Sequence, residues 1–240
     1  GIDILVGTAF YNNMYTQENV LLYSGSCLIG ANITTDSLSV TLPENTISIA
    51  GHAFKDCTNI TSITIPASVT SIGERAFIGC TNLKEVVIPG TVTSIGANIF
   101  AGLSSLERVV ISNGVTAIGF SAFKNCTGLK EITIPSTVTS IGSYAFDGCS
   151  SLENVAIPSG VTKINDYVFS EYRGLKSVTI PSTVESIGVG AFYQCENLTT
   201  VNLSEGIKSV GSKAFMDCKK VTTISIPNSL ESIDSEAFAN

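Results

Sequence analysis

The chain has 240 residues, of which 44% are hydrophobic and only 14% charged, and its formal net charge is −7. This acidic balance argues against nucleic acids and anionic membranes as partners, because both attract clustered Lys and Arg. No apolar run approaches the roughly 18–20 residues that span a bilayer, so no membrane span is expected in this chain.

The first 36 residues lack the periodicity of the rest. The start, Gly1-Ile2-Asp3, has neither the basic segment nor the apolar core of a signal peptide, although a removed signal would leave no trace. Two apolar runs, 20–23 and 26–29, flank Ser24-Gly25 and resemble a β-hairpin around a tight turn. We therefore expect residues 1–36 to form an atypical cap over the first repeat.

From residue 37 onward a 23-residue period holds without insertion. The phenylalanines that mark it are Phe54, Phe77, Phe100, Phe123, Phe146, Phe169, Phe192, Phe215 and Phe238. A fixed period of 20–50 residues is the signature of stacked supersecondary units. Residues 37–240 are therefore predicted to form one solenoid of about nine coils.

Each repeat is predicted to contain two short strands. In the repeat that ends at Phe100, Val86 and Ile88 alternate inward on the first strand, which Pro89 ends because proline has no N–H to donate. Val92 and Ile95 point inward from the second strand. The prediction is a right-handed coil with parallel β-sheets, since successive coils place equivalent strands side by side.

A glycine and an Ala-Phe-x-x-Cys stretch close each repeat. The glycine phase is occupied by Asn165 and Asp234 in two repeats, which predicts a left-handed backbone corner. The stretch around the Phe is interpreted as one short helical turn per 23-residue repeat.

Residues 134–149, Ile-Pro-Ser-Thr-Val-Thr-Ser-Ile-Gly-Ser-Tyr-Ala-Phe-Asp-Gly-Cys, resemble the BspA-like branch of the leucine-rich-repeat proteins. The resemblance covers about residues 37–240. It implies a leucine-rich-repeat-like fold, a secreted or cell-surface location, and adhesion to host proteins or other cells. The buried Asn ladder of the commoner leucine-rich repeats is missing here, so their horseshoe curvature is expected to transfer only loosely.

Six of the seven cysteines lie three residues after a repeat Phe: Cys57, Cys80, Cys126, Cys149, Cys195 and Cys218. Neighbouring coils bring three pairs within reach of a disulfide, but parallel side chains are poorly aimed to bond. Buried free thiols are the favoured interpretation. Cysteines arranged in a linear ladder do not converge on one metal ion. The single histidine, His52, lies at a repeat position where the residue type varies from repeat to repeat, which indicates the protein surface. No catalytic, metal or cofactor residues are predicted, and an enzyme is not expected.

Charged residues alternate in sign from repeat to repeat. One phase carries Lys84, Glu107 and Lys130, and the next carries Glu85, Arg108 and Glu131. Opposite charges facing each other across paired strands stabilise the pairing, so we expect these ladders to fix coil register.

The remaining surface suggests protein contacts on the first strands and at an aromatic edge. The candidate contact residues are Val87, Arg108, Val110, Glu131, Thr133, Ala156, Phe120, Tyr144 and Tyr167. The favoured function is a non-enzymatic, adhesin-like domain that binds an extracellular or host protein through an extended shallow sheet. A passive spacer and a glycan-binding module stay open as alternatives, although Trp is absent. Because the chain stops just after Phe238, we expect that it continues or that this end pairs with another molecule.

Overall fold

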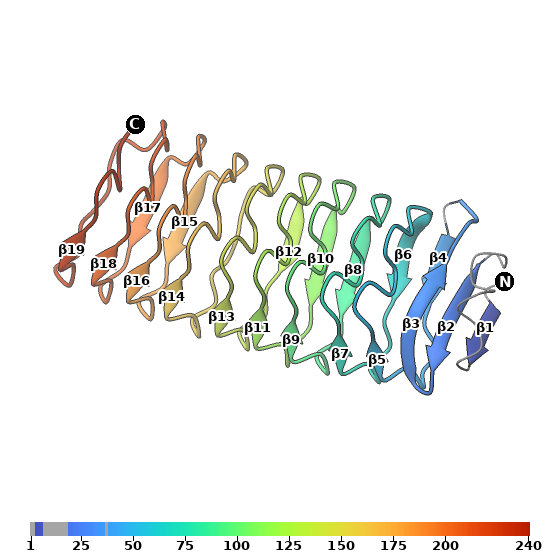
Figure 1. Cartoon of the computed structure of the whole chain (residues 1–240). Helices are drawn as coiled ribbons and strands as arrows, with labels where there is room; N and C mark the ends of the chain where they lie inside the picture. The colour runs from blue at the N-terminus through green and yellow to red at the C-terminus, as the bar shows by residue number, and fades with distance from the viewer. Residues whose placement is uncertain (1–2, 7–18, 37) are drawn as a thin grey trace.

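A computed structural model describes residues 3–6, 19–36 and 38–240. Within residues 38–240 the chain winds into nine coils stacked along one axis (Figure 1). We number the coils 1 to 9 by their core phenylalanines, from Phe54 to Phe238. The predicted parallel solenoid is confirmed, and it places equivalent side chains of successive coils next to one another.

Two ladders of parallel strands run along the stack. The first strands of the coils are β4 (Leu38–Thr41), β6 (Ile60–Thr64), β8 (Glu85–Ile88), β10 (Arg108–Ile111), β12 (Glu131–Thr133), β15 (Ser177–Ile180) and β17 (Thr200–Leu203). The second strands are β5 (Ser48–Ile49), β7 (Ser71–Ile72), β9 (Ser94–Ile95), β11 (Ala117–Ile118), β13 (Ser140–Ile141), β14 (Lys163–Ile164), β16 (Ser186–Ile187), β18 (Ser209–Val210) and β19 (Ser232–Ile233). Pro89 and Pro181 directly follow β8 and β15, where a ladder N–H is no longer needed.

The N-terminal strands are β1 (Asp3–Val6), β2 (Val20–Ser24) and β3 (Cys27–Asn32). β2 and β3 form an antiparallel hairpin whose turn contains Gly25 at φ 60°. β3 then pairs in parallel with β5, so the hairpin continues the second-strand ladder of coil 1. The boundary of this cap at residue 36 stays a prediction, and residues 1–2, 7–18 and 37 lie outside the described residues.

A column of stacked phenyl rings occupies the core. From Phe54 to Phe238, consecutive ring centroids are 5.0–5.7 Å apart, and the ring planes differ by at most 19°. The eight rings from Phe54 to Phe215 are at most 1% exposed. Each ring therefore packs against the equivalent ring of the next coil, and no coil buries its apolar side chains alone.

The segment around each Phe is not the helical turn that the sequence predicts. It is a run of turns with positive φ two residues before and two residues after the Phe, as at His52 (61°) and Asp56 (58°). Alternate N–H groups consequently point along the stack: Phe54 N–H donates to the carbonyl of Ala76 in the next coil, at 2.8 Å. A helix would direct these donors to its own carbonyls, whereas here they form a third ladder, which we call the turn ladder.

The predicted left-handed corner at the glycine phase is also wrong. Gly73 and Gly119 do not have positive φ. Their role is to allow close approach: a Cβ on Gly119 would lie 2.7 Å from the carbonyl oxygen of Ile95, and one on Gly73 would collide with the Gly51 amide. Asn165 occupies this phase in coil 6, where its side chain donates to the Ile141 carbonyl at 2.7 Å.

The stack is interrupted at coil 6. Residues 153–157, in the place of a first strand, pair with neither β12 nor β15, and β13 and β14 lie in different sheets. The turn ladder continues across this junction, because Phe146 N–H donates to the Val168 carbonyl at 2.9 Å. The second-strand ladder is also interrupted between β7 and β9, but there β6 and β8 remain paired. The junction of coils 5 and 6 thus depends on the turn ladder, the ring stack and side-chain hydrogen bonds such as that from Asn165 to Ile141.

Close approach at the glycine phase predicts unequal costs for two alanine substitutions. Gly73→Ala should destabilise the fold by about 1–3 kcal/mol, because the methyl group would overlap the backbone of coil 1. Gly96→Ala should change stability by less than about 1 kcal/mol, because its Cβ would make only ordinary contacts, the nearest being Ile99 Cδ1 at 3.4 Å and the Ile72 carbonyl oxygen at 3.5 Å. Urea unfolding of both variants measures the difference. Equal costs at the two positions would contradict the close-approach explanation.

The ring stack predicts a large cost for removing a central phenyl group. Phe146→Ala should lower the free energy of unfolding by about 3–5 kcal/mol, because the rings on either side cannot close the cavity. The control is Phe120→Ala, which removes a ring that is 51% exposed and should cost about 1 kcal/mol or less. Denaturant unfolding followed by circular dichroism compares the two.

Candidate binding surface

The outward face of β8, β10 and β12 brings together most of the predicted sheet residues. Val110 lies directly between Val87 and Thr133 in the strand register. Val87 is 44% exposed, Val110 is half-buried and Thr133 is exposed. Ala156 is exposed too, but it belongs to the unpaired segment of coil 6 rather than to this sheet. The structure thus assembles a shallow surface with valines at its centre.

Arg108 and Glu131, also predicted as contact residues, are engaged within the ladder. Arg108 Nη1 lies 2.6 Å from Glu85 Oε1, and its Nε lies 3.5 Å from Glu131 Oε2. Both carboxylates belong to neighbouring coils, exactly one repeat away in sequence. Arg108 therefore joins three coils and borders the valines, as the predicted charge ladder requires.

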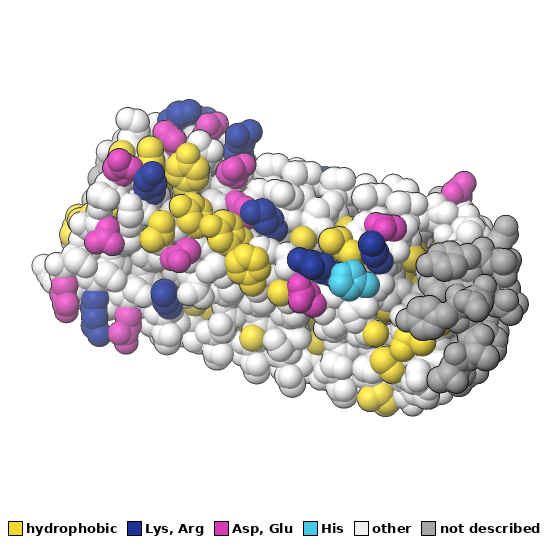
Figure 2. Space-filling model, in the orientation of Figure 1, with side chains coloured by type: hydrophobic (Ala, Val, Ile, Leu, Met, Phe, Trp, Pro, Cys, Tyr) yellow, Lys and Arg dark blue, Asp and Glu magenta, His cyan; other side chains and the backbone are white. Residues whose placement is uncertain are grey.

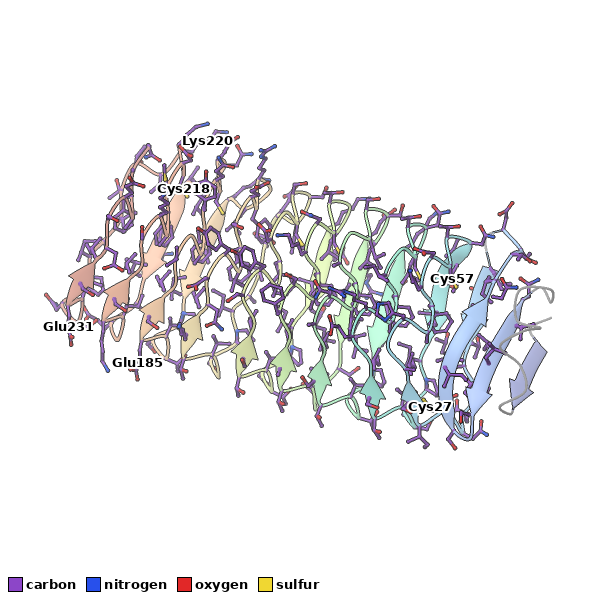
Figure 3. All side chains as sticks on the ribbon, in the orientation of Figure 1. Cys27, Cys57, Glu185, Cys218, Lys220 and Glu231 are labelled. Atoms are coloured by element: carbon purple, nitrogen blue, oxygen red, sulfur yellow. The ribbon has the colours of Figure 1, made fainter. Side chains whose placement is uncertain are left out.

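Further ion pairs join neighbouring coils in the same way. Lysine-to-carboxylate distances are 2.8 Å for Lys130–Glu107, 2.8 Å for Lys176–Glu153, 2.9 Å for Lys208–Glu185 and 3.1 Å for Lys219–Glu196. Hydrogen bonds from the lysines lower the pKa of Glu107, Glu153 and Glu196. The Glu185 hydrogen bond raises the pKa of Lys208, and Figure 3 shows Glu185 and Glu231 on the same edge of the stack. Apart from the half-buried Glu196 these groups are exposed, so each pair contributes little alone and more as part of a ladder.

The predicted aromatic residues form a continuous cluster on the turn segments of coils 4, 5 and 6. The ring centroids of Phe120 and Tyr144 lie 5.7 Å apart at 66°, and those of Tyr144 and Tyr167 lie 5.0 Å apart and nearly parallel. We call Phe120, Tyr144 and Tyr167 the aromatic edge. On the face shown in Figure 2, hydrophobic side chains form a band with charged side chains beside it. The aromatic edge and the valine surface lie on different parts of the coil.

Sequence reasoning missed the polar groups that hold the aromatic edge. Lys124 Nζ lies 4.7 Å from the centroid of the Tyr144 ring and 2.8 Å from Asp147 Oδ2. Asp147 is buried and also accepts a hydrogen bond from Ser170 of coil 6. The repeat spacing could have revealed these pairs, because Lys124–Asp147 and Asp147–Ser170 are each one period apart. Through Lys124, these contacts restrict the orientation of the Tyr144 ring.

The cysteines are free thiols, and the six that follow a repeat Phe belong to the core. Each repeat thiol from coil 2 onward donates to the carbonyl of the preceding coil's Phe, as Cys126 does to Phe100 at 3.0 Å. Burial raises the pKa of Cys57 to about 11 and that of Cys126 to about 12, so neither is a thiolate at neutral pH. Cys27 is half-buried rather than buried, and Figure 3 shows it on the other edge of the stack from Cys57.

The remaining candidates for a chemical role are the single histidine, clusters of metal-ligating side chains and membrane-spanning helices. His52 is exposed, in agreement with its predicted surface position. In the described part of the chain, no group of three or more His, Cys, Asp or Glu side chains could hold a metal ion. Over the same residues, no helix is long and apolar enough to cross a membrane.

The stacked parallel strands and this surface define a leucine-rich-repeat solenoid. The family described as "BspA type Leucine rich repeat region (6 copies)" matches residues 33–153 and 139–240. The chain therefore belongs to the BspA-type leucine-rich-repeat family. No curated protein matches the chain.

Solved structures of bacterial leucine-rich-repeat proteins share the fold. The T. pallidum leucine-rich-repeat protein TpLRR is 25% identical, with a TM-score of 0.63 over 81% of this chain and 82% of that one. A leucine-rich cell surface protein from Faecalibacterium prausnitzii A2-165 is 30% identical, with a TM-score of 0.55 over 96% of this chain. A leucine-rich-repeat protein from Eubacterium ventriosum is 23% identical, with a TM-score of 0.54 over all of this chain and 88% of that one. The chain spans 66% of the length of the F. prausnitzii protein.

The charge ladder predicts that reversing one rung lowers thermal stability at low salt. Glu107→Lys places a cation beside Lys130 and near Lys84, so the melting temperature should fall at about 10 mM salt and recover largely at about 1 M. The control is Ser104→Lys, which adds a cation at an exposed position outside the ladder. If the melting temperature at low salt were unchanged, the charge ladder would not fix the register between neighbouring coils.

The same ladder sets a pH dependence. Because the folded-state pKa values of Glu107, Glu153 and Glu196 lie below their ordinary value of 4.5, their stabilisation is complete above that pH. It is lost as the pH falls below 4.5 through the lowered values. Glu107→Gln should reduce this acid sensitivity when melting temperatures are compared at pH 3 and pH 7.

Proposed function

We propose that the chain is a non-enzymatic protein-binding domain of a secreted or cell-surface protein, and that it contacts a host or bacterial protein through the face of β8, β10 and β12. The observation that carries the proposal is the exposed Val87, which lies beside Val110 at the centre of a flat sheet with charge ladders along its border. Apolar centres with polar rims are typical of protein interfaces.

The family supports the same assignment. One of the similar solved structures is described as a leucine-rich cell surface protein, and solenoids present extended faces to partners. The aromatic edge provides a second contact area, because tyrosines held in fixed orientations lose little conformational entropy on binding. Its stacked pair, Tyr144 and Tyr167, would anchor the rim of a broad interface.

A spacer that holds another domain away from the cell is the second candidate. The uninterrupted ring stack favours it, because a rigid stack carries load without contacting a ligand. The spacer predicts no affinity of the isolated chain for other proteins, whereas the binding domain predicts saturable affinity for at least one.

Binding of the purified chain to immobilised extracellular-matrix proteins tests the proposal. We expect saturable binding by surface plasmon resonance, and loss of that binding in the double variant Val87→Arg, Val110→Arg. The control is Asn202→Arg, at the same repeat phase on β17. Binding that survives the double variant would exclude the β8–β12 face, and no binding to any protein of the panel would favour the spacer.

A further inference from the structure

Coil 6 leaves backbone groups unpaired inside the first-strand sheet. The sheet ends at β12 on one side, begins again at β15 on the other, and residues 153–157 between them pair with neither strand. We call the opening between residues 153–157 and β15 the coil-6 gap. Strand β15, which faces this gap, contains no charged residue that would block its edge, although the Lys176–Glu153 ion pair joins the two sides just before the strand.

The direction of the unpaired groups follows from the strand alternation. The carbonyl of Lys176 accepts the N–H of Thr199, so it points toward coil 8. In a parallel strand, successive residues direct their N–H and C=O groups to opposite neighbours, so those of Ser177 and Thr179 point toward coil 6. No carbonyl of the described segment 153–157 accepts these two N–H groups. The N–H groups of Ser177 and Thr179, which are two residues apart, therefore face the coil-6 gap.

The gap contains a hollow with apolar and polar walls. Its volume is about 420 Å³, and it is lined on one side by residues 154–157 and on the other by Ser177, Thr179 and Pro181. Val155 is only half-buried there, whereas Val86 and Val109 at the equivalent phase are fully buried. A side chain entering the hollow would complete the burial of Val155.

A second hollow, beside the start of β15, carries positive charge. Its volume is about 400 Å³, and Arg173, Lys176 and Lys220 line it. Lys176 is paired with Glu153, which also lines the hollow, and Lys220 donates to Asn197 Oδ1 at 2.6 Å, whereas Arg173 forms none of the ion pairs found among the described residues. In a chain of net charge −7, Arg173 makes this end of the gap locally attractive to a carboxylate, whereas Lys220 lies two coils further along, in coil 9.

We propose that the coil-6 gap binds an extended peptide segment of a partner protein, with an acidic residue at the Arg173 end and alternating apolar residues beyond it. The segment accepts hydrogen bonds from the N–H groups of Ser177 and Thr179, which lie about 6.6 Å apart along the strand, the spacing of alternate carbonyls in an extended chain. The proposal rests on the proposed protein-binding function and locates its partner segment.

Strand addition is the recognition mode that this geometry fits. Backbone donors give affinity for any extended chain, while the hollow and the cationic rim select side chains. A globular surface or a folded helix has its carbonyls already bonded and cannot reach both donors. A glycan or inorganic anion could reach the cations but would leave the hollow beside Val155 unfilled.

The probe is a capped hexapeptide, EETVTI, which combines an acidic start with the alternation of this chain's own first strands. Its binding to the full chain is measured by fluorescence anisotropy, against a scrambled peptide of the same composition. We expect saturable binding of EETVTI that is at least about 10-fold tighter than that of the scrambled peptide. Hydrogen exchange should show rapid exchange of the Ser177 and Thr179 amides without peptide and slower exchange with it.

Two substitutions at one residue isolate the backbone donor. Thr179→Pro removes an N–H that has no partner in the free protein, so the variant should fold normally and bind EETVTI about 10-fold more weakly. Thr179→Val keeps the N–H and should bind like the unmodified chain. Val110→Pro removes a paired N–H of β10 and should destabilise the fold. This difference would show that proline is tolerated at residue 179 because the N–H there is unpaired.

Two further variants test the hollow and its rim without changing the donors. Ala156→Tyr should fill the hollow and abolish binding, and Arg173→Glu should weaken binding and reduce its dependence on salt. Equal binding of the two peptides, unchanged binding in Thr179→Pro, or failure of Thr179→Pro to fold would each overturn the proposal.

The outcome is separable from that of the proposed function. If matrix proteins bind through Val87 and Val110 and EETVTI does not bind, the protein-binding function stands and the coil-6 gap site is rejected. If EETVTI binds with the expected dependence on residue 179 and no matrix protein binds, the gap site stands and the β8–β12 face is rejected.

Discussion

A constant register between neighbouring coils is the constraint on which the structure depends. The phenyl stack, the two strand ladders, the turn ladder and the ion pairs all join a residue to one about a single repeat away. One inserted residue in any coil would displace all of these contacts at once, since they share the same axis. The ring column forms a continuous part of the apolar core along this axis, and the surface ladders add selectivity for the correct alignment.

The regular part of this architecture could be predicted because its signals are local and repeated. The 23-residue spacing located the rings, alternation located the first strands, and sign reversal between Glu85, Arg108 and Glu131 identified the ion pairs that the structure contains. The turn around the Phe was misjudged because Ala-Phe-x-x-Cys spacing suits both a helix and a left-handed turn. What decides between them is an acceptor in the next coil, such as the Ala76 carbonyl for Phe54, and one repeat does not show it.

The glycine phase shows a similar limit. Asn and Asp replacing Gly suggested positive φ, yet at Gly73 and Gly119 the structure requires a small residue because two backbones nearly touch. Asn165 is tolerated in coil 6 because the second-strand ladder is open at that junction and its amide takes over the hydrogen bond to Ile141. The opening itself was not predictable, since residues 150–157 follow the repeat pattern as well as any other coil. For the same reason Ala156 was grouped with the valines of the sheet, although it lines the coil-6 gap.

The turn ladder and the second-strand ladder differ in the direction of the hydrogen bonds that join one coil to the next. In the turn ladder, N–H groups point toward the following coil, as from Phe54 to Ala76, whereas in the second-strand ladder Gly73 N–H points back to Ile49. The peptide dipoles therefore add up along the turn ladder, where His52, Phe54 and Asp56 all donate forward, whereas they alternate within parallel strands and largely cancel. Each added coil extends this alignment by one more set of peptide units, so the partial charges of the turn ladder lie at the two tips of the rod however many repeats separate them.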